Sequence, residues 1–327
     1  MFCLNEARAN PAKKTKAASF KDQQNIITRL AAAGVEELVI SGGEPLIHPH
    51  CTSLIAHAAN LGMKVSIQTN GYFINEKFLQ KVKGKLSFIQ VSLEGTIKEH
   101  ELVTWTHDFE RVAANMRRVI SSGIPLATNF TITKQNHTCL EAYIRLIETI
   151  GVSFANFTRL YNSGNARRNQ SRLELSKDEM ATFLKDLEAQ QKKSRIPLIL
   201  AGPTPLCFLA AHHVQLTNVN TCGAGKDEIN ILPNGDVTMC PSDATIAGNL
   251  LVQPLESIWH ASLLANIGER KNAHPECKSC ELFSVCGGCC LVSGVSGACK
   301  GCDVYMVQPP VKQQLKQQLP QTAALNP

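Results

Sequence analysis

The hydrophobic pattern of residues 20–161 switches repeatedly between two periods. Segments with apolar residues three and four positions apart predict amphipathic helices, and most of them close on a glycine, which readily ends a helix. The predicted helices cover 22–34, 51–62, 75–84, 108–123 and 139–151. Short apolar runs follow them and predict strands, which lie within 36–45, 64–71, 86–95, 125–133 and 153–161.

Strands that alternate with helices in this way form a parallel sheet, because right-handed crossovers return each strand in the same direction. We therefore expect an α/β fold in which five visible strands form a partial parallel (β/α) barrel, spanning residues 1–204. In such folds the chemistry lies in the loops that follow the strands. Here these loops are rich in Gly, Asn, Thr and charged residues, as loops that build a site are expected to be.

The periodicity fades after a further predicted helix at 175–194, for which Ser176 supplies an N-cap. Residues 205–304 are rich in Cys and Gly and predict a small, separate Cys-rich domain. Within it, 228–240 predicts a hairpin that turns at Asn234–Gly235. The Gln- and Pro-rich tail at 305–327 is predicted to be disordered.

Charge and composition narrow the partners and the compartment. The net charge of +6 is spread over basic clusters with little aromatic interleaving, which predicts solvated faces and no nucleic-acid partner. The chain has no apolar run of about 18 residues and opens without a signal-peptide pattern, so we expect no membrane span and a cytoplasmic location. Because disulfides are rare there, the 13 cysteines indicate metal or iron–sulfur ligation.

The C-terminal cysteines fall into two blocks. The first reads Cys222-x12-Gly-x4-Cys240, and the second reads Cys277-x2-Cys280-x5-Cys286-x3-Cys290, with Cys299 and Cys302 following. Thiolates at such short spacings can converge on one metal centre, and soft sulfur ligands select zinc or iron–sulfur clusters. Spacing alone leaves a four-cysteine zinc site and an iron–sulfur site equally open.

The order and spacing of the two blocks resemble the SPASM domain found at the C-terminus of radical SAM enzymes. The resemblance implies one or two auxiliary [4Fe–4S] clusters. By the family's pattern Cys222, Cys240 and Cys290 would bind the first cluster, with Cys207 as a candidate fourth ligand. The second cluster would take Cys277, Cys280, Cys286 and one late cysteine, for which Cys302 is preferred to Cys299, and Cys289 would be a spare thiol.

The sequence Ser-Gly-Gly-Glu-Pro at 41–45 resembles the radical SAM element that holds the amino group of S-adenosylmethionine. The resemblance assigns that role to Gly42, Gly43, Glu44 and Pro45. Glycines allow close approach of the backbone, and a glutamate can accept hydrogen bonds from a charged amine.

Later strand ends resemble the family's further contacts with S-adenosylmethionine. Ser92 and Glu94 would face the ribose or the carboxylate, and Asn129 and Arg159 would lie deeper, where Arg159 could pair with the carboxylate. The ordinary alternatives are a satisfied polar group on a strand for Asn129 and a structural ion pair for Arg159.

The opening residues resemble one end of the C-x3-C-x2-C motif that binds the radical SAM cluster. Phe2–Cys3 matches its last cysteine, so Cys3 is the candidate catalytic cluster ligand, whereas the other two cysteines and the first barrel strand would precede Met1. We expect a misplaced start and a longer working protein; a decayed remnant and a cluster-free scaffold are the alternatives. One cysteine alone could not hold this cluster.

For the full-length form the resemblance implies reductive cleavage of S-adenosylmethionine to a 5′-deoxyadenosyl radical, which abstracts a hydrogen from the substrate. A peptide or protein substrate is expected, as in maturases, with a flavodoxin or ferredoxin as electron donor. The alternatives are a small-molecule enzyme of the haem-pathway kind, a zinc- or cluster-binding scaffold without catalysis, and a plain electron carrier.

Overall fold

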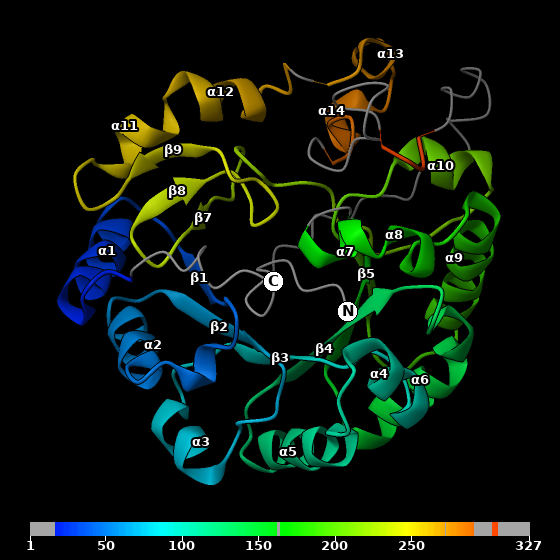
Figure 1. The fold of residues 1–327 in the computed structure, drawn as a ribbon, viewed down its shortest axis with the longest axis horizontal. Coiled ribbons are helices and arrows are strands. Elements are labelled where there is room, and N and C mark those ends of the chain that lie inside the picture. Colours follow the sequence, from blue (N-terminus) through cyan, green and yellow to red (C-terminus); the bar gives the residue numbers. More distant parts are fainter. Residues whose placement is uncertain (1–16, 162–163, 272, 291–302, 307–327) are drawn as a thin grey trace.

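The computed structural model describes residues 17–161, 164–271, 273–290 and 303–306. Cys3, Cys299, Cys302 and the tail from residue 307 onward lie outside the described residues. A six-stranded sheet dominates the described part, and its strands pair in chain order, all parallel. They are β1 (Glu37–Ile40), β2 (Lys64–Thr69), β3 (Phe88–Ser92), β4 (Leu126–Ile132), β5 (Phe154–Arg159) and β6 (Leu198–Ala201). The sheet curves into an arc, which confirms the predicted α/β fold with a partial parallel barrel (Figure 1).

Helices cover the outer face of this arc (Figure 1). The barrel helices and short 3-10 turns are α1 (Phe20–Ala32), η2 (Pro45–Ile47), α2 (Cys51–Asn60), α3 (Glu76–Val82), α4 (Ile97–Thr104), α5 (Phe109–Ser121), η3 (His137–Cys139), α6 (Leu140–Ile150), α7 (Gly164–Arg168), α8 (Gln170–Leu173) and α9 (Lys177–Gln191). Helix α5 buries Val112, Met116 and Val119, which lie on one helical face. The predicted N-cap of α9 is confirmed: Ser176 and Glu179 form a reciprocal capping box.

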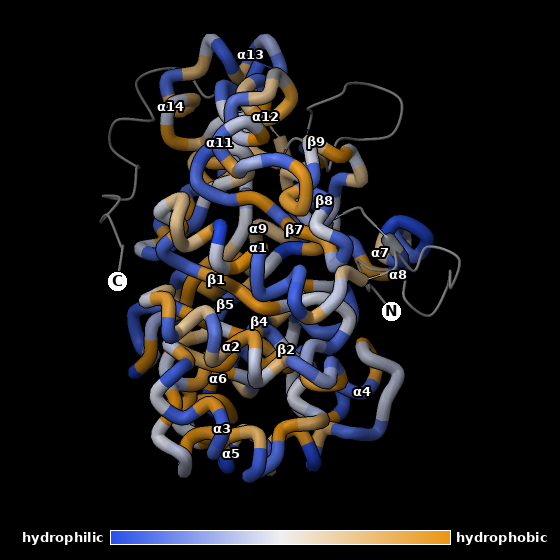
Figure 2. Tube along the Cα trace, turned by 90° about the vertical axis from the view of Figure 1, so that its left-hand side faces the viewer, coloured by the Kyte–Doolittle hydropathy of each residue, from blue (hydrophilic) through white to orange (hydrophobic). Residues whose placement is uncertain are grey.

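Aromatic side chains fill the space between the outer face of the sheet and its helices. Phe130 of β4 lies 4.8 Å from Tyr143 of α6 and 5.6 Å from Phe157 of β5, measured between ring centroids. Phe183 of α9 stacks on the same cluster. Hydrophobic segments accordingly concentrate around β4, β5 and the helices packed against them (Figure 2). This packing leaves the opposite, inner face of the sheet to carry polar groups.

Strand β6 and helix α4 are the main departures from the predicted elements. The sequence predicted five strands, but Leu198–Ala201 forms a sixth. Its residues Leu-Ile-Leu-Ala form an unbroken apolar run between Pro197 and Gly202, which periodicity alone cannot assign to a strand. Its outer edge pairs with the following chain, since the Leu200 N–H donates to the Asn218 carbonyl at 2.9 Å. Helix α4 lacks a continuous apolar stripe, because its buried residues are a histidine and a valine.

The C-terminal region lies across the open side of the sheet's arc, opposite α3 and α5 (Figure 1). Its elements are α10 (Leu206–Ala211), β7 (Asn230–Ile231), β8 (Asp236–Thr238), β9 (Ile246–Asn249), α11 (Leu255–Trp259), α12 (Ser262–Gly268), α13 (Pro275–Lys278) and α14 (Phe283–Cys286). The predicted hairpin is confirmed as β7 and β8, and β9 extends it to a three-stranded antiparallel sheet. The hairpin turn touches the barrel, because the Ala18 N–H donates to the Pro233 carbonyl at 2.8 Å. Among the described residues, no helix has the length and apolar character needed to cross a membrane.

Candidate functional site

The Gly-Gly-Glu-Pro loop follows β1 and is pinned to the end of β2 by Glu44. The Glu44 carboxylate accepts hydrogen bonds from the Leu46 N–H at 3.1 Å, the Thr69 hydroxyl at 2.7 Å and the Asn70 N–H at 2.8 Å. A carboxylate offers about four acceptor positions, so Glu44 keeps capacity for one further donor. Gly42 has φ +133°, a conformation that L side chains rarely adopt, and no atom crowds the space where its Cβ would stand. The loop is therefore rigid at Glu44 and open along its backbone.

Polar side chains form a ladder across the inner face of the sheet. The Asn156 side-chain amide donates to Oε1 of Gln90 at 2.8 Å, and the Thr158 hydroxyl donates to Oδ1 of Asn129 at 2.7 Å. Asn129 and Asn156 are register partners on adjacent strands. All four side chains are half-buried. A polar inner face that ends near the Glu44 loop suits a polar ligand rather than a hydrophobic core.

Glu94 follows β3 and is buried, with 2% of its surface exposed. Its carboxyl group accepts from the Thr131 N–H at 2.6 Å and lies 3.2 Å from the Thr131 hydroxyl. Burial raises the pKa of Glu94 to about 8, although the two Thr131 contacts oppose the shift. Ser92, two residues earlier, is half-buried at the end of the same strand. The structure thus brings Ser92 and Glu94 to the edge of the sheet where Glu44 lies, as parallel strands require.

Arg159 ends β5 and is buried, with 1% of its surface exposed. Its guanidinium forms an ion pair with Asp303, and its Nε donates to the Pro203 carbonyl at 2.7 Å. Burial lowers the pKa of Arg159, and the Asp303 carboxylate outweighs it, so that the net shift is upward. The ion pair is the arrangement that the structure shows for this side chain. The role toward the carboxylate of S-adenosylmethionine stays a prediction.

Cys289 and Cys290 are adjacent in sequence but point to different neighbours. The Cys289 sulfur lies 3.1 Å from Oδ2 of Asp303 and 3.3 Å from the Pro203 carbonyl oxygen, and burial raises its pKa well above the ordinary value. Cys289 has φ +66°, in the left-handed region. Cys290 is an electrostatic neighbour of Cys240 and, like Cys289, of Arg159. Of the two thiols, Cys290 is therefore the one that lies near Cys240.

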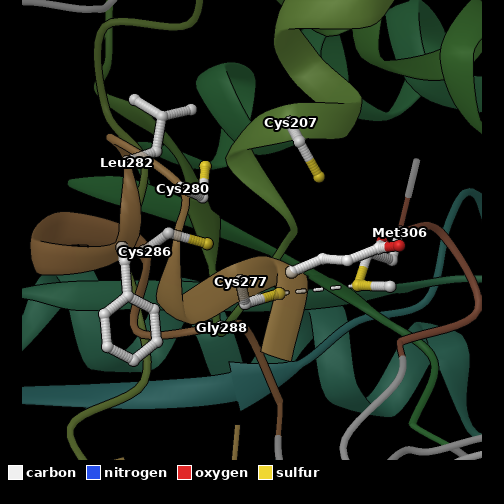
Figure 3. A pocket seen from close by; sticks show the side chains of 9 residues that line it. Cys207, Cys277, Cys280, Leu282, Cys286, Gly288 and Met306 are labelled. Atoms are coloured by element: carbon white, nitrogen blue, oxygen red, sulfur yellow. Dashed lines mark hydrogen bonds between the residues drawn. The ribbon is translucent and has the colours of Figure 1, made fainter. Parts of the chain in front are cut away.

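A pocket at the top of the molecule gathers cysteine side chains from α10, α13 and α14 (Figure 3). Cys207, Cys277, Cys280 and Cys286 line it together with Leu282, Phe283, Gly288, Glu276 and Met306. The Cys277 sulfur lies 3.5 Å from Sδ of Met306. Backbone N–H groups of Leu206, Cys289 and Gly288 point at the Cys286 sulfur and lower its pKa, whereas burial raises it by more.

A second set of thiols lies apart from this pocket. Cys222 and Cys290 are both electrostatic neighbours of Cys240, whose pKa burial raises to about 12. Arg270, only 3% exposed, lies beside this set: its Nη1 is 3.6 Å from the Cys222 sulfur. Among the described residues, Nε of Arg270 has no hydrogen-bond partner. This buried cation gives the set a positive neighbour.

The donor sets consist of thiols, which are soft ligands that zinc and iron–sulfur clusters take. In the described part of the chain, no group of three or more His, Cys, Asp or Glu side chains is set to hold one metal ion.

Two family models match the chain. The radical SAM superfamily model matches residues 1–147, and the iron–sulfur cluster-binding SPASM domain model matches residues 222–281. The chain therefore carries a region that matches the radical SAM superfamily, followed by a region that matches the SPASM domain. Members of this family use [4Fe–4S] clusters and S-adenosylmethionine, so these are the cofactors that the match implies.

Curated relatives and a solved structure agree with the family models. A PqqA peptide cyclase from Rhizobium meliloti (strain 1021) is 25% identical over 334 residues, covering 99% of this chain and 87% of the relative. An AdoMet-dependent heme synthase from Methanosarcina barkeri (strain Fusaro / DSM 804) is 22% identical over 298 residues, covering 82% of this chain and 81% of the relative. Streptococcus suis SuiB bound to precursor peptide SuiA has a TM-score of 0.72 and 16% identity, covering 94% of this chain and 72% of SuiB.

Several residues of the site escaped sequence reasoning. Gln90, Asn156 and Thr158 join Asn129 on the inner face, and the alternation of polar and apolar residues in 153–161 carried that signal. Asp303 gave no signal, because its partner lies 144 residues away in the chain. Such distant pairs cannot be read from local pattern.

Proposed function

We propose that this chain is a radical SAM enzyme that modifies a peptide or protein. With its cofactors bound, such an enzyme cleaves S-adenosylmethionine reductively to a 5′-deoxyadenosyl radical, which takes a hydrogen atom from the substrate. The observation that carries the proposal is the Gly-Gly-Glu-Pro loop pinned by Glu44 beside a polar inner sheet face, in a chain that both family models match. The peptide cyclase relative supports a peptide substrate.

The proposed binding residues of S-adenosylmethionine surround the carboxyl ends of the strands. Gly42, Gly43, Glu44 and Pro45 would hold the amino group, for which Glu44 has a free acceptor position. Ser92 and Glu94 would face the ribose or the carboxylate, and Asn129 would contribute from the ladder. Arg159 would pair with the carboxylate of S-adenosylmethionine while it keeps its ion pair with Asp303. Cys3, outside the described residues, would bind the catalytic cluster.

The proposed auxiliary clusters lie in the C-terminal region. Cys222, Cys240 and Cys290 would hold the first, and Cys277, Cys280 and Cys286 would hold the second. Cys302 and Cys299, outside the described residues, are further candidates. We also propose a flavodoxin or ferredoxin as electron donor, a cytoplasmic location, and the domain division 1–204, 205–304 and 305–327.

The test uses the working protein with a complete C-x3-C-x2-C motif that ends at Cys3, purified without oxygen and reconstituted with iron and sulfide. Reduced enzyme with S-adenosylmethionine and a deuterated precursor peptide should yield 5′-deoxyadenosine that carries deuterium, detected by mass spectrometry. Iron-loaded protein that binds S-adenosylmethionine but never cleaves it would reject the enzyme proposal. A colourless protein that contains zinc and no iron would favour the scaffold alternative.

The heme synthase relative supports a second candidate, a small-molecule substrate of the haem pathway. The two candidates differ in where the deuterium originates. The same assay with a deuterated haem precursor in place of the peptide decides between them. Deuterium transfer from the haem precursor alone would overturn the peptide proposal and keep the radical SAM reaction.

A further inference from the structure

Helix α10 brings a cysteine from the barrel side into the C-terminal thiol pocket. The helix begins five residues after β6, and Cys207 is its second residue. Its sulfur points into the pocket toward Cys277 and Met306, and the Cys286 sulfur points into it from the opposite side, with Cys280 lining the pocket nearby (Figure 3). Four thiols therefore share one pocket, three of them on separate helices and Cys280 in the turn between α13 and α14. The family resemblance had suggested Cys207 for the other thiol set.

The start of α10 is held directly against this pocket. The Leu206 N–H, one residue before Cys207, points at the Cys286 sulfur, as do the N–H groups of Cys289 and Gly288. N–H groups directed at thiolate sulfur are the contacts that tune iron–sulfur clusters. The backbone N–H next to Cys207 therefore already contacts the Cys286 sulfur.

The pocket walls suit a soft, low-charge group. Leu282 and Phe283 supply apolar surface, and Met306 adds a thioether 3.5 Å from the Cys277 sulfur. Glu276 is the one charged side chain among the described residues that line the pocket. Hard cations such as magnesium or calcium prefer oxygen ligands, so this lining selects a sulfur-bound cluster.

The other thiol set has its own surroundings and does not involve Cys207. Cys240 has Cys222 and Cys290 as electrostatic neighbours, and Arg270 contacts Cys222. The thiols that the structure describes in the C-terminal region thus separate into a group of four and a group of three, with Cys289 turned toward Asp303.

We propose that Cys207 is the fourth thiolate ligand of the second auxiliary cluster, together with Cys277, Cys280 and Cys286. The proposal rests on the proposed function only in that the chain binds auxiliary clusters. It moves Cys207 from the first cluster to the second and makes a late cysteine unnecessary there. The connection between barrel and SPASM domain then becomes part of the metal site.

The first test counts iron in the reconstituted full chain. Cys207→Ala and Cys280→Ala should each lose about four iron atoms per chain. If a variant keeps this iron, the electron paramagnetic resonance signal of the second cluster should change, and the same signal should change in both variants. The double variant Cys207→Ala/Cys280→Ala should lose no more than either single variant. Cys207→Ala/Cys222→Ala should show two independent losses, because it damages two clusters.

The matched control is Cys139→Ala, which removes a thiol at the start of α6 in the barrel and should leave iron and spectrum unchanged. If Cys207→Ala behaves like this control, the proposal is overturned. It is also overturned if Cys207→Ala/Cys222→Ala loses no more than Cys222→Ala, since Cys207 would then serve the first cluster. Cys302→Ala should keep the second cluster, and losing that cluster instead would overturn the proposal.

A second measurement leaves Cys207 intact, so it does not depend on folding of a Cys207 variant. In the Cys222→Ala/Cys240→Ala chain, reconstitution should protect Cys207 and Cys280 together from alkylation by iodoacetamide. Alkylation of Cys207 to the same extent before and after reconstitution would overturn the proposal. Neither measurement involves cleavage of S-adenosylmethionine. A chain with the expected iron pattern and no cleavage would reject the proposed function alone.

Discussion

The guanidinium of Arg159 and the carboxylate of Asp303 form an ion pair in which each side chain is only 1% exposed. The pair joins the last residue of β5 to the end of the Cys-rich region at 205–304. The rings of Tyr161 and Tyr305 lie 5.0 Å and 5.6 Å from the guanidinium carbon. The charge is therefore enclosed by a carboxylate and two aromatic faces, and the C-terminal segment closes over the end of the barrel.

Removing one partner of this pair should destabilise the fold strongly. Asp303→Ala leaves a buried, unpaired guanidinium, which costs about 3–5 kcal/mol. The apo protein should show this loss in its free energy of unfolding, measured in urea. The double variant Arg159→Met/Asp303→Leu should recover most of it, because no buried charge remains.

The exposed pair Lys64–Glu37 is the matched control for this experiment. Its side chains are 55% and 64% exposed, so Glu37→Ala should change the free energy of unfolding by less than about 1 kcal/mol. Equal losses for Asp303→Ala and Glu37→Ala would contradict the importance of burial. A double variant no more stable than Asp303→Ala would argue that the surrounding packing, and not the charge, determines stability here.

Glu94 should make stability depend on pH in a defined direction. The folded chain keeps the Glu94 proton up to a pKa of about 8, whereas the unfolded chain releases it near 4.5. The folded state binds more protons between these values, so its contribution to stability is complete below pH 4.5 and is lost as pH rises toward 8. Glu94→Gln cannot ionise and should remove this decline from the urea midpoint measured against pH.

The exposed residue Glu76, in the first turn of α3, provides the control. Glu76→Gln should leave the shape of the pH curve unchanged. Parallel curves for the unaltered chain and for Glu94→Gln would show that Glu94 is ionised in the folded protein, which a raised pKa does not allow below pH 8.

Alanine substitutions at Gly42 and Gly43, in the loop after β1, should change the free energy of unfolding by different amounts. Gly42 has φ +133°, whereas Gly43 lies outside the positive-φ region, and neither has an atom within 4 Å of a built Cβ. Gly42→Ala should therefore cost about 1–3 kcal/mol of unfolding free energy through backbone strain alone. Gly43→Ala, with the same added methyl group, should be nearly neutral in the same urea titration. Similar costs for both would mean that the loop relaxes around the substitution.

Binding of S-adenosylmethionine should depend on the Glu44 charge. Glu44→Gln removes a charge-assisted hydrogen bond to the amino group, which corresponds to roughly 10- to 100-fold weaker binding. Calorimetric titration of the reconstituted chain measures this directly. Thr69→Val removes one hydrogen-bond donor to Glu44 but keeps the Glu44 charge, so it tests the loop contact alone. It should weaken binding of S-adenosylmethionine less than Glu44→Gln does. Unchanged affinity for Glu44→Gln would show that Glu44 serves only to hold the loop.

Arg270 should raise the reduction potential of the cluster at Cys222. A positive charge beside the thiolates stabilises the reduced, more negative state. Losing a charge-assisted hydrogen bond of ~1.5–3 kcal/mol in a one-electron step corresponds to a fall of about 60–130 mV for Arg270→Met. Redox titration followed by electron paramagnetic resonance reports the change. Lys271→Met removes the same charge from an exposed neighbour and should barely move the potential.

The fold was largely predictable because its signals are local. Alternating periods and terminal glycines located five strands and their helices, and Asn234–Gly235 located the hairpin. Strand β6 escaped because Leu198–Ala201 is an unbroken apolar run, which shows neither the strand period nor the helix period. Of the site, the loop at Gly42–Pro45 and the cysteine blocks carry dense short-range patterns. The partner of Arg159 and the neighbours of Cys207 arise only when segments distant in sequence pack together, so no local pattern could reveal them.

Because Asp303 follows Arg159 by 144 positions, the ribosome synthesises Arg159 well before its ion-pair partner. A ribosome that adds about 5–20 residues per second takes roughly 7–30 s to synthesise the 144 positions between them. During that interval β5 has emerged without its counter-charge, and its terminal guanidinium must remain hydrated. The ion pair can therefore close over the barrel only after Asp303, and the cysteines that precede it, have left the ribosome.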